Sequence, residues 1–267
     1  MPVTTDISMA KAPLPVELRG ATLSFGPKVI LDGMDLAVRP GAKLSLLGEN
    51  SSGKSSILKV MVGLVRPESG QALLFGRDPR KVSRQELDRL RRRVGMQFQS
   101  GAMFDSMTVT ENLLLAGIER SRGRPGADVS AKGILGLLER VGLGHAAKLR
   151  PSELSGGMRK RAALARALIA EPELALFDEP TAGLDPVTAS LIINLLRELS
   201  EKREAAMILA TSDVDVARRF SPDLILIKKG RVAARGTVAD LLASPDPYVS
   251  NYLSRFKRVD RALNAGD

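Results

Sequence analysis

The stretch Ala42-Lys-Leu-Ser-Leu-Leu-Gly48-Glu-Asn-Ser-Ser-Gly53-Lys54-Ser55-Ser56 decides how this chain folds. Residues 42–47 are mostly apolar and predict a buried strand, and residues 56–62 predict a helix. The intervening pattern, Gly-x4-Gly-Lys-Ser, lets backbone N–H groups converge on anionic oxygens at the positive end of the helix. A glycine-rich turn with a solvated lysine is the alternative, but the flanking strand and helix favour a phosphate-binding loop. The residues predicted to bind phosphate are Gly48, Glu49, Asn50, Ser51, Ser52, Gly53, Lys54, Ser55 and Ser56.

Two adjacent carboxylates, Asp178 and Glu179, follow the apolar run of residues 174–177. That run predicts a central parallel strand, and open α/β sheets bind ligands at the carboxyl ends of such strands. We expect the Lys54 ammonium to reach the β- and γ-phosphates of a nucleotide. The Ser55 hydroxyl and Asp178 are expected to hold Mg2+, Asp178 through water, while Glu179 polarises the attacking water as general base. An acidic helix cap is the alternative for the carboxylate pair.

A second glycine-rich element, Leu154-Ser155-Gly156-Gly157-Met158, precedes a helical stretch at 158–168. Ser155 is a typical helix N-cap, and Gly156 and Gly157 let the helix end approach a second anion. Together with the phosphate loop and the Asp-Glu pair, this signature resembles that of the ATP-binding subunit of ABC transporters, over residues 16–245. The resemblance implies that Ser155, Gly156 and Gly157 contact the γ-phosphate of ATP held by the other subunit of a head-to-tail homodimer.

The resemblance also implies roles for residues outside the two glycine-rich loops. Gln99 matches the glutamine that senses Mg2+ and the attacking water beside the membrane partner, so it is expected to serve both catalysis and the metal site. Phe25 matches the aromatic that stacks on adenine, although a lone aromatic could equally belong to the core. Asp185, in the loop 182–186, matches a residue that reaches across the dimer interface; an ordinary Gly and Pro turn is the alternative.

One position departs from the ABC pattern. After the predicted strand at 206–210 the family has a histidine that contacts the γ-phosphate, whereas this chain has Ser212. A hydroxyl can still donate to a phosphate oxygen but carries no positive charge, so we expect Ser212 to be a weak catalytic substitute and hydrolysis to be slow. The alternative is that Ser212 only caps the helix that follows. The single histidine, His145, is expected to be a surface or packing residue.

These motifs predict an α/β fold: a P-loop NTPase (RecA-like) core of the ABC ATPase type, with N-terminal antiparallel β strands and a helical lobe. The antiparallel strands are expected within residues 16–40, with turns at Gly26-Pro27 and Asp32-Gly33, and a later turn is expected at Lys229-Gly230. After Gln99 the apolar pattern becomes helical. The predicted parts are a disordered N-terminus at 1–15, the core at 16–98 and 151–245, the helical lobe at 99–150 and a C-terminal tail at 246–267.

Two further stretches indicate a branch of the family. Residues 98–104, Phe-Gln-Ser-Gly-Ala-Met-Phe, and residues 244–253, Ser-Pro-Asp-Pro-Tyr-Val-Ser-Asn-Tyr-Leu, resemble segments of Mla/Mce-type lipid-trafficking ATPases. The resemblance implies two partners besides a second copy of the chain: an integral-membrane permease and an Mce-type substrate-binding protein. It also implies movement of phospholipid or related hydrophobic molecules across the bacterial envelope. An ATPase of another ABC importer is the alternative.

Composition limits the mode of membrane contact. The chain has 267 residues and no cysteine, which suits a reducing compartment. It has no apolar run of the ~18 residues that a membrane helix needs, and its first residues lack the apolar core of a signal peptide. We expect a peripheral protein at the cytoplasmic face of the inner membrane.

The net charge of +10 raises nucleic-acid binding as a rival function. Aromatic residues form only 3% of the chain, so stacking platforms for bases are scarce. The basic run at 89–93 is expected to be a solvated face. A soluble ABC protein acting on ribosomes or nucleic acid usually carries two cassettes, whereas this sequence has one phosphate loop and one signature. We therefore expect no nucleic-acid partner.

Overall fold

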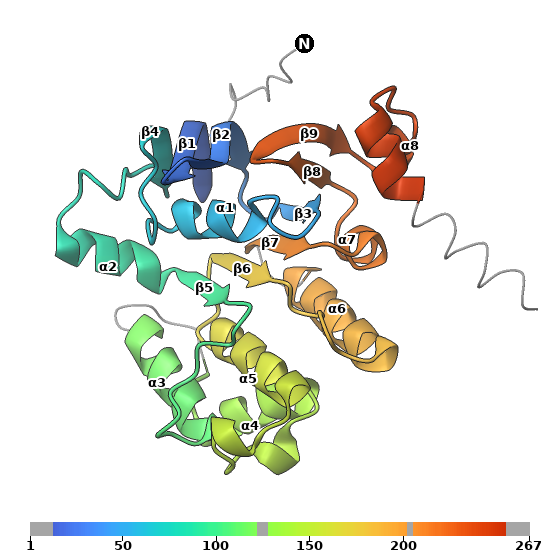
Figure 1. The fold of residues 1–267 in the computed structure, drawn as a ribbon. Coiled ribbons are helices and arrows are strands. Elements are labelled where there is room, and N and C mark those ends of the chain that lie inside the picture. The colour runs from blue at the N-terminus through green and yellow to red at the C-terminus, as the bar shows by residue number, and fades with distance from the viewer. Residues whose placement is uncertain (1–12, 122–127, 202–204, 255–267) are drawn as a thin grey trace, which may run out of the picture.

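The computed structural model describes residues 13–121, 128–201 and 205–254. A six-stranded sheet lies at the centre, a three-stranded sheet lies beside it, and a group of helices extends from one edge (Figure 1). Residues 1–12 of the predicted disordered N-terminus and 255–267 of the predicted tail lie outside the described residues. In spatial order the strands of the central sheet are β5 (Val94–Gln97), β6 (Leu174–Asp178), β7 (Ala206–Thr211), β3 (Lys43–Gly48), β8 (Leu224–Lys228) and β9 (Arg231–Gly236).

The central sheet is parallel except at one edge. Parallel pairing joins β5, β6, β7, β3 and β8, and every residue of β5, β6 and β7 is buried, which explains the continuous apolar runs of the sequence. β9 returns antiparallel to β8 through Lys229 and Gly230, whose φ angles of 47° and 75° suit a tight hairpin. The predicted turn at Lys229-Gly230 is confirmed.

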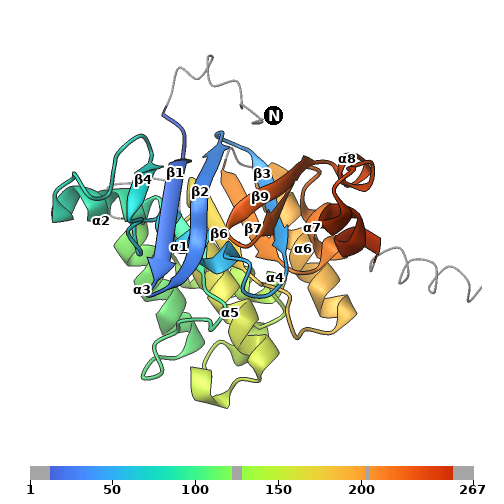
Figure 2. The same cartoon turned by 45° about the horizontal axis from the view of Figure 1, so that its top comes forward.

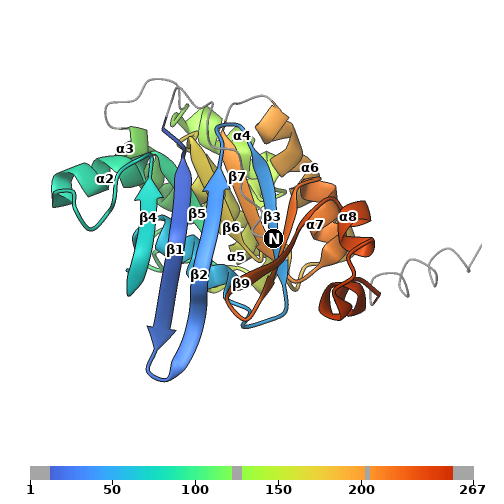
Figure 3. The same cartoon turned by 90° about the horizontal axis from the view of Figure 1, so that it is seen from above.

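The N-terminal sheet is antiparallel, as predicted, and is seen from above in Figure 3. The turn at Gly26-Pro27 is confirmed, but the turn at Asp32-Gly33 is wrong because both residues lie inside β2. There Gly33 has a φ of 61° and its N–H donates to Thr22 Oγ1 at 3.2 Å, within a pairing interrupted by register shifts. The glycine accommodates an irregular strand rather than reversing it. The strands, in spatial order, are β2 (Lys28–Val38), β1 (Val16–Phe25) and β4 (Ser69–Leu74).

Helix α1 lies between the two sheets and holds them together. Its apolar residues Ile57, Leu58 and Met61 are fully buried in a cluster that includes strands of both sheets. Because α1 starts directly after β3, this packing fixes the loop that joins them. The helices are α1 (Lys54–Met61), α2 (Arg84–Arg92), α3 (Val109–Ser121), α4 (Ala131–Arg140), α5 (Gly156–Leu168), α6 (Pro186–Glu201), α7 (Val214–Phe220) and α8 (Val238–Leu242), with 3-10 turns at Gly144–Ala146 and Pro151–Glu153.

The group of helices at the edge of the central sheet consists of α3, α4 and α5 (Figure 1). The segment predicted as a helical lobe, 99–150, contains α3 and α4, while α5 packs against both α3 and β5. One apolar cluster therefore runs from Leu113 and Leu138 in the lobe to Phe177 in the central sheet. Helix α5 therefore packs between the lobe and the strand that ends at Asp178.

The basic run at 89–93 is not simply the solvated face that its charge predicts. The guanidinium of Arg91 donates to the carbonyls of Val62 and Gly63, at 3.2 and 2.8 Å. Arg93 pairs with Glu173 at 2.6 Å and lies over the Phe75 ring, 3.5 Å from its centroid. The prediction is wrong for these two residues, because their side chains cap a helix end and join strands.

The described part of the tail is folded. Residues 247–254 form a helix whose Val249, Tyr252 and Leu253 are buried against α7 and β3. Figure 2 shows this segment, which follows α8, beside α7. None of the helices in the described ranges combines the length and apolar character needed to cross a membrane.

Candidate active site

The phosphate loop lies between β3 and α1, and its conformation depends on glycine. A Cβ on Gly48 would stand 2.6 Å from the carbonyl oxygen of Ile227, on neighbouring β8, so no side chain fits there. Ser51 and Gly53 adopt positive φ angles of 63° and 108°. The Lys54 ammonium donates to the carbonyls of Gly48 and Glu49 at 2.7 and 3.0 Å, so the loop encircles the side chain. The backbone forms the kind of concave nest that binds phosphate.

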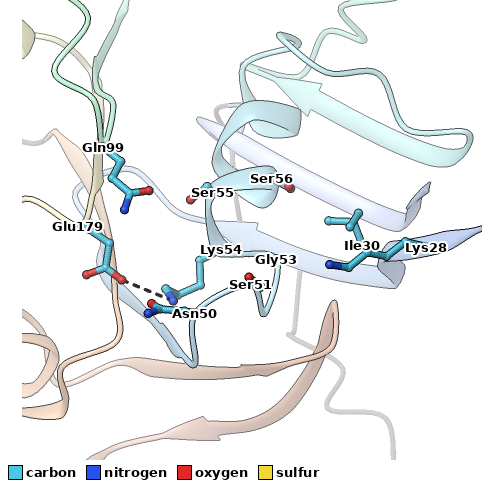
Figure 4. Close-up of a pocket in the computed structure, with 10 residues that line it drawn as sticks. All are labelled: Lys28, Ile30, Asn50, Ser51, Gly53, Lys54, Ser55, Ser56, Gln99 and Glu179. Atoms are coloured by element: carbon cyan, nitrogen blue, oxygen red, sulfur yellow. Dashed lines mark ion pairs between the residues drawn. The ribbon is translucent and has the colours of Figure 1, made fainter. Parts of the chain in front are cut away.

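Lys54 also faces the general base expected from the sequence. Its Nζ lies 3.5 Å from Glu179 Oε1, and the two residues are only 5% and 7% exposed (Figure 4). Burial lowers the pKa of Lys54, and the Glu179 carboxylate partly offsets this effect. Burial raises the pKa of Glu179, against the opposing effect of Lys54. A raised carboxyl pKa favours a proton acceptor near neutral pH, as general-base catalysis requires.

The second carboxylate contacts the first turn of α1. Asp178, 2% exposed, accepts a hydrogen bond from the Ser55 hydroxyl at 3.0 Å. Burial raises the pKa of Asp178, although the bond from Ser55 works in the other direction. A hydroxyl and a carboxylate side by side are the oxygen ligands that Mg2+ prefers. The donor set therefore fits the predicted metal, with Ser55, Asp178 and Gln99 as the residues that would hold it.

The backbone at Glu179 has an uncommon conformation. Its φ is 48°, which a non-glycine residue rarely adopts, and its N–H donates to the carbonyl of Ala210 on β7 at 2.9 Å. Its Oε1 lacks a hydrogen-bond partner among the described residues, as does Ser52 Oγ. Strain of this kind concentrates at functional sites. Apart from the Lys54 ammonium at 3.5 Å, this buried carboxylate oxygen has room to accept a hydrogen bond from a water or ligand.

A cavity of about 370 Å³ gathers residues from four separate parts of the chain (Figure 4). Its volume lies in the range of small-molecule sites. Of the residues predicted from sequence, those that line it are Asn50, Ser51, Gly53, Lys54, Ser55, Ser56, Gln99 and Glu179. Two further lining residues, Lys28 and Ile30 on β2, were missed. The only sequence signal for Lys28 is a basic residue directly after the Gly26-Pro27 turn.

Phe25 lies at the end of β1, where it pairs with Lys28 across the hairpin. It is 58% exposed, so the alternative that it belongs to the core is wrong. Its neighbour Lys28 lines the cavity, and the ring is thus close to the site without being among its lining residues. Stacking on adenine stays a prediction.

The signature lies apart from this cavity. Ser155 is the N-cap of α5, its Oγ accepting from the N–H of Met158 at 3.2 Å, and both Ser155 and Gly156 are exposed. Nothing in the described structure lies within 4 Å of a Cβ placed on Gly156. Figure 1 shows α5 in the helical group and α1 between the sheets. A single chain therefore presents two separate helix ends of the kind that bind anions.

The two remaining predicted residues lie on exposed loops. Asp185 accepts a hydrogen bond from the N–H of Thr188 at 2.9 Å, and this bonding lowers its pKa. Ser212 lies between β7 and α7, but its proposed role as a cap is wrong, because Asp213 accepts from the first N–H groups of α7. The Ser212 carbonyl accepts a hydrogen bond from the Tyr252 hydroxyl at 2.7 Å. The exposed His145 is a surface residue, as one of its two expected roles required.

Comparison with known proteins agrees with this geometry. A family model described as ABC transporter matches residues 31–182. The chain is 37% identical over 238 residues to the intermembrane phospholipid transport system ATP-binding protein MlaF of Haemophilus influenzae, covering 89% of each chain. It is 37% identical over 242 residues to the methionine import ATP-binding protein MetN of Rhizobium johnstonii, covering 89% of this chain and 65% of the relative. A solved dimeric ATP-binding cassette, in a post-hydrolysis state with ADP and Pi, aligns with a TM-score of 0.76 and 31% identity over 84% of this chain and 98% of that chain.

Proposed function

The chain belongs to the ABC transporter family, as an ATP-binding subunit that hydrolyses ATP to ADP and phosphate in coupling to transport, and from this premise we propose that it powers phospholipid trafficking across a bacterial envelope. The proposal for the cargo rests on the similarity to MlaF, which extends over 89% of both chains, and on the sequence of residues 98–104. Phospholipid or a related hydrophobic molecule is therefore the substrate class.

One observation carries the assignment of the chemistry: residues from the phosphate loop, the 98–104 loop and the end of β6 line one cavity. Lys54 faces this cavity as a buried cation and binds the phosphates of ATP. Glu179, whose pKa is raised by burial, accepts the proton of the attacking water. Bound Mg2+ would neutralise negative charge on the phosphates. Ser212 donates a hydrogen bond to the γ-phosphate in place of the family's histidine.

The signature belongs to the nucleotide of a second copy. Ser155, Gly156 and Gly157 lie on the exposed end of α5, outside the cavity that holds Lys54. A head-to-tail homodimer brings this end, with Asp185, to the partner's phosphate loop. The similarity to a cassette solved as a dimer supports this arrangement. Each ATP is then enclosed by two subunits.

The membrane partner binds beside the 98–104 loop. Phe104 is 48% exposed, and Met103 is partly buried against the apolar cluster of the lobe. We assign this surface to a cytoplasmic helix of the permease, which places the subunit at the cytoplasmic face of the inner membrane. An Mce-type substrate-binding protein completes the assembly.

Purification from detergent-solubilised membranes tests the proposed cargo. Tagged protein should retain a permease and an Mce-type protein, and mass spectrometry should detect bound phospholipid. A Met103→Asp/Phe104→Asp variant should lose the permease but still bind ATP, because a charge in the contact would have to be desolvated. The similarity to MetN makes an amino-acid importer the second candidate. A permease retained without an Mce-type protein, in a complex whose ATPase responds to amino acid and not to phospholipid vesicles, would favour that candidate.

A further inference from the structure

The helix at residues 247–254 packs against α7, α8 and the strands β3 and β8. Asp246 Oδ1 accepts from the N–H of Tyr248 at 2.7 Å and fixes the start of this helix. Val249, Tyr252 and Leu253, at helical spacing, are 0%, 7% and 0% exposed, so one face of the helix is buried. The apolar cluster they enter includes Leu47, which immediately precedes the phosphate loop. The helix is therefore an integral part of the core near the nucleotide site.

One polar contact of this helix reaches the position where the family has a histidine. The Tyr252 hydroxyl donates to the carbonyl of Ser212 at 2.7 Å (Figure 2 shows the segment beside α7). Burial raises the pKa of the Tyr252 hydroxyl, and the nearby carboxylates of Glu179 and Glu49 add to the rise. The hydroxyl thus stays protonated and acts as a donor. In the described structure no other hydrogen bond reaches the Ser212 carbonyl.

The loop held in this way is short and directly connected to the general base. The carbonyl of Ala210 accepts from the N–H of Glu179 at 2.9 Å. Thr211 Oγ1 accepts from the N–H of Asp213 at 3.1 Å, and Asp213 in turn caps α7. The Ser212 carbonyl is held by a group from a third part of the chain, the Tyr252 hydroxyl. A shift of the Ser212 backbone would move the Cα from which its hydroxyl extends.

We propose that Tyr252 is a positioning residue for ATP hydrolysis, which holds the Ser212 backbone so that its hydroxyl faces the γ-phosphate. This inference rests on the proposed role of Ser212. The helix at 247–254 thereby contributes to turnover without touching the nucleotide. ATP binding, which depends on the phosphate loop, is independent of this hydrogen bond.

Steady-state ATP hydrolysis by the full chain in its transporter complex tests the proposal. Tyr252→Phe keeps the buried ring and removes the hydroxyl; we expect kcat to fall about three- to tenfold, the effect of losing one neutral hydrogen bond, with KM for ATP unchanged. Tyr248→Phe is the matched control, since it removes a hydroxyl from the same helix and keeps the ring that lies under the Lys228 ammonium. It should hydrolyse ATP at the parental rate.

A double variant shows whether Tyr252 acts through Ser212. In a Ser212→Ala background, Tyr252→Phe should cause no further loss, whereas a purely structural effect would persist in both backgrounds. A parental kcat in Tyr252→Phe, a change confined to KM, or an equal loss in both backgrounds would overturn the inference. The proposed function fails by a different result: no hydrolysis by the unaltered chain, or unchanged hydrolysis in Lys54→Ala.

Discussion

The first turns of α1 and α5 both follow glycine-rich loops, but only one of them is surrounded by its own chain. The N-cap of α1 is Gly53, which has no side chain to cap the helix. Within the described structure the first N–H groups of α1 therefore remain available to a ligand. Lys54, Ser55 and Glu179 line the same cavity. The N-cap of α5 is Ser155, whose own hydroxyl accepts from an N–H of the helix, and this end is exposed.

The two helix ends can therefore have different functions. The end of α1 supplies a cation and a hydroxyl, and the end of β6 places two carboxylates, Asp178 and Glu179, beside it, so this region can bind and activate a nucleotide. The end of α5 supplies backbone donors and a partial positive charge alone, which suffices to touch an anion held elsewhere. We infer that the first end binds ATP and the second completes the site of a partner.

The largest effect on ATP hydrolysis is expected from a change in the cavity beside the first turn of α1. Glu179→Gln keeps the shape of the side chain and removes the base, so ATP hydrolysis should fall roughly 10²–10⁴-fold, the usual contribution of general acid–base catalysis. ATP should still bind, and size-exclusion chromatography with ATP should show an accumulated dimer. Lys54→Ala is the control, because it should weaken ATP binding itself. Hydrolysis at the parental rate in Glu179→Gln would show that another group is the base.

A change at the exposed N-terminal end of α5 should also reduce ATP hydrolysis, but it should leave ATP binding intact. Ser155→Arg should reduce hydrolysis roughly 10²–10³-fold, because its long side chain would keep the backbone donors of this helix end away from a charge that develops in the transition state. Binding of labelled ATP should stay close to parental, because Ser155 is exposed in the single chain and lies apart from the cavity of Lys54. The protein should stay folded, and its free energy of unfolding should fall only by the cost of losing the helix cap, about 0.5–2 kcal/mol.

A mixed dimer distinguishes action on the partner's nucleotide from action on the chain's own. Pairing a Ser155→Arg subunit with a Lys54→Ala subunit leaves one composite site intact and places both defects in the other. The mixture should therefore regain ATP hydrolysis that neither variant has alone. If both sites were built within single chains, each would keep one defect and the mixture would stay inactive.

Sequence reasoning succeeded where a function depends on neighbours in the chain. The phosphate loop, the cap at Ser155 and the buried strand before Asp178 are local patterns, and all three lie in the expected elements. The prediction was wrong where one dipeptide pattern occurs both in hairpin turns and inside irregular strands. Asp32-Gly33 is typical of a hairpin turn, but here cross-strand pairing continues past it and the glycine serves an irregular strand. Turn chemistry alone does not distinguish these cases.

Other residues of the site could not be predicted because distant segments bring them together. Lys28 reaches the cavity since β2 lies beside the phosphate loop, and Tyr252 reaches Ser212 since a helix of the tail packs on α7. Neither contact follows from spacing in the sequence. The charge of Arg93 likewise predicts that its side chain is solvated. In the structure Glu173 and Phe75, which come from distant parts of the chain, contact this side chain.

The smallest expected effect comes from one methyl group placed at each loop. Gly48→Ala puts a Cβ 2.6 Å from the Ile227 carbonyl, which the pairing of β3 and β8 holds in place, so the free energy of unfolding should fall by about 1–3 kcal/mol. Gly156→Ala meets open space in the described structure and replaces a helical glycine, so stability should stay equal or rise by up to about 1 kcal/mol. Urea denaturation of the two variants measures this difference.

The ATPase rate of Gly156→Ala then tests whether the open space at Gly156 receives a partner's nucleotide. If a partner's nucleotide approaches this helix end, the added methyl should lower the ATPase rate of Gly156→Ala even though the subunit is at least as stable as the parent. In that case glycine at 156 would serve the close approach of another molecule, whereas Gly48 is needed for the fold of its own loop. A Gly156→Ala variant with full activity would mean that the phosphate stays at least a methyl radius away, and the contact would then have to come from Ser155 or Gly157 alone.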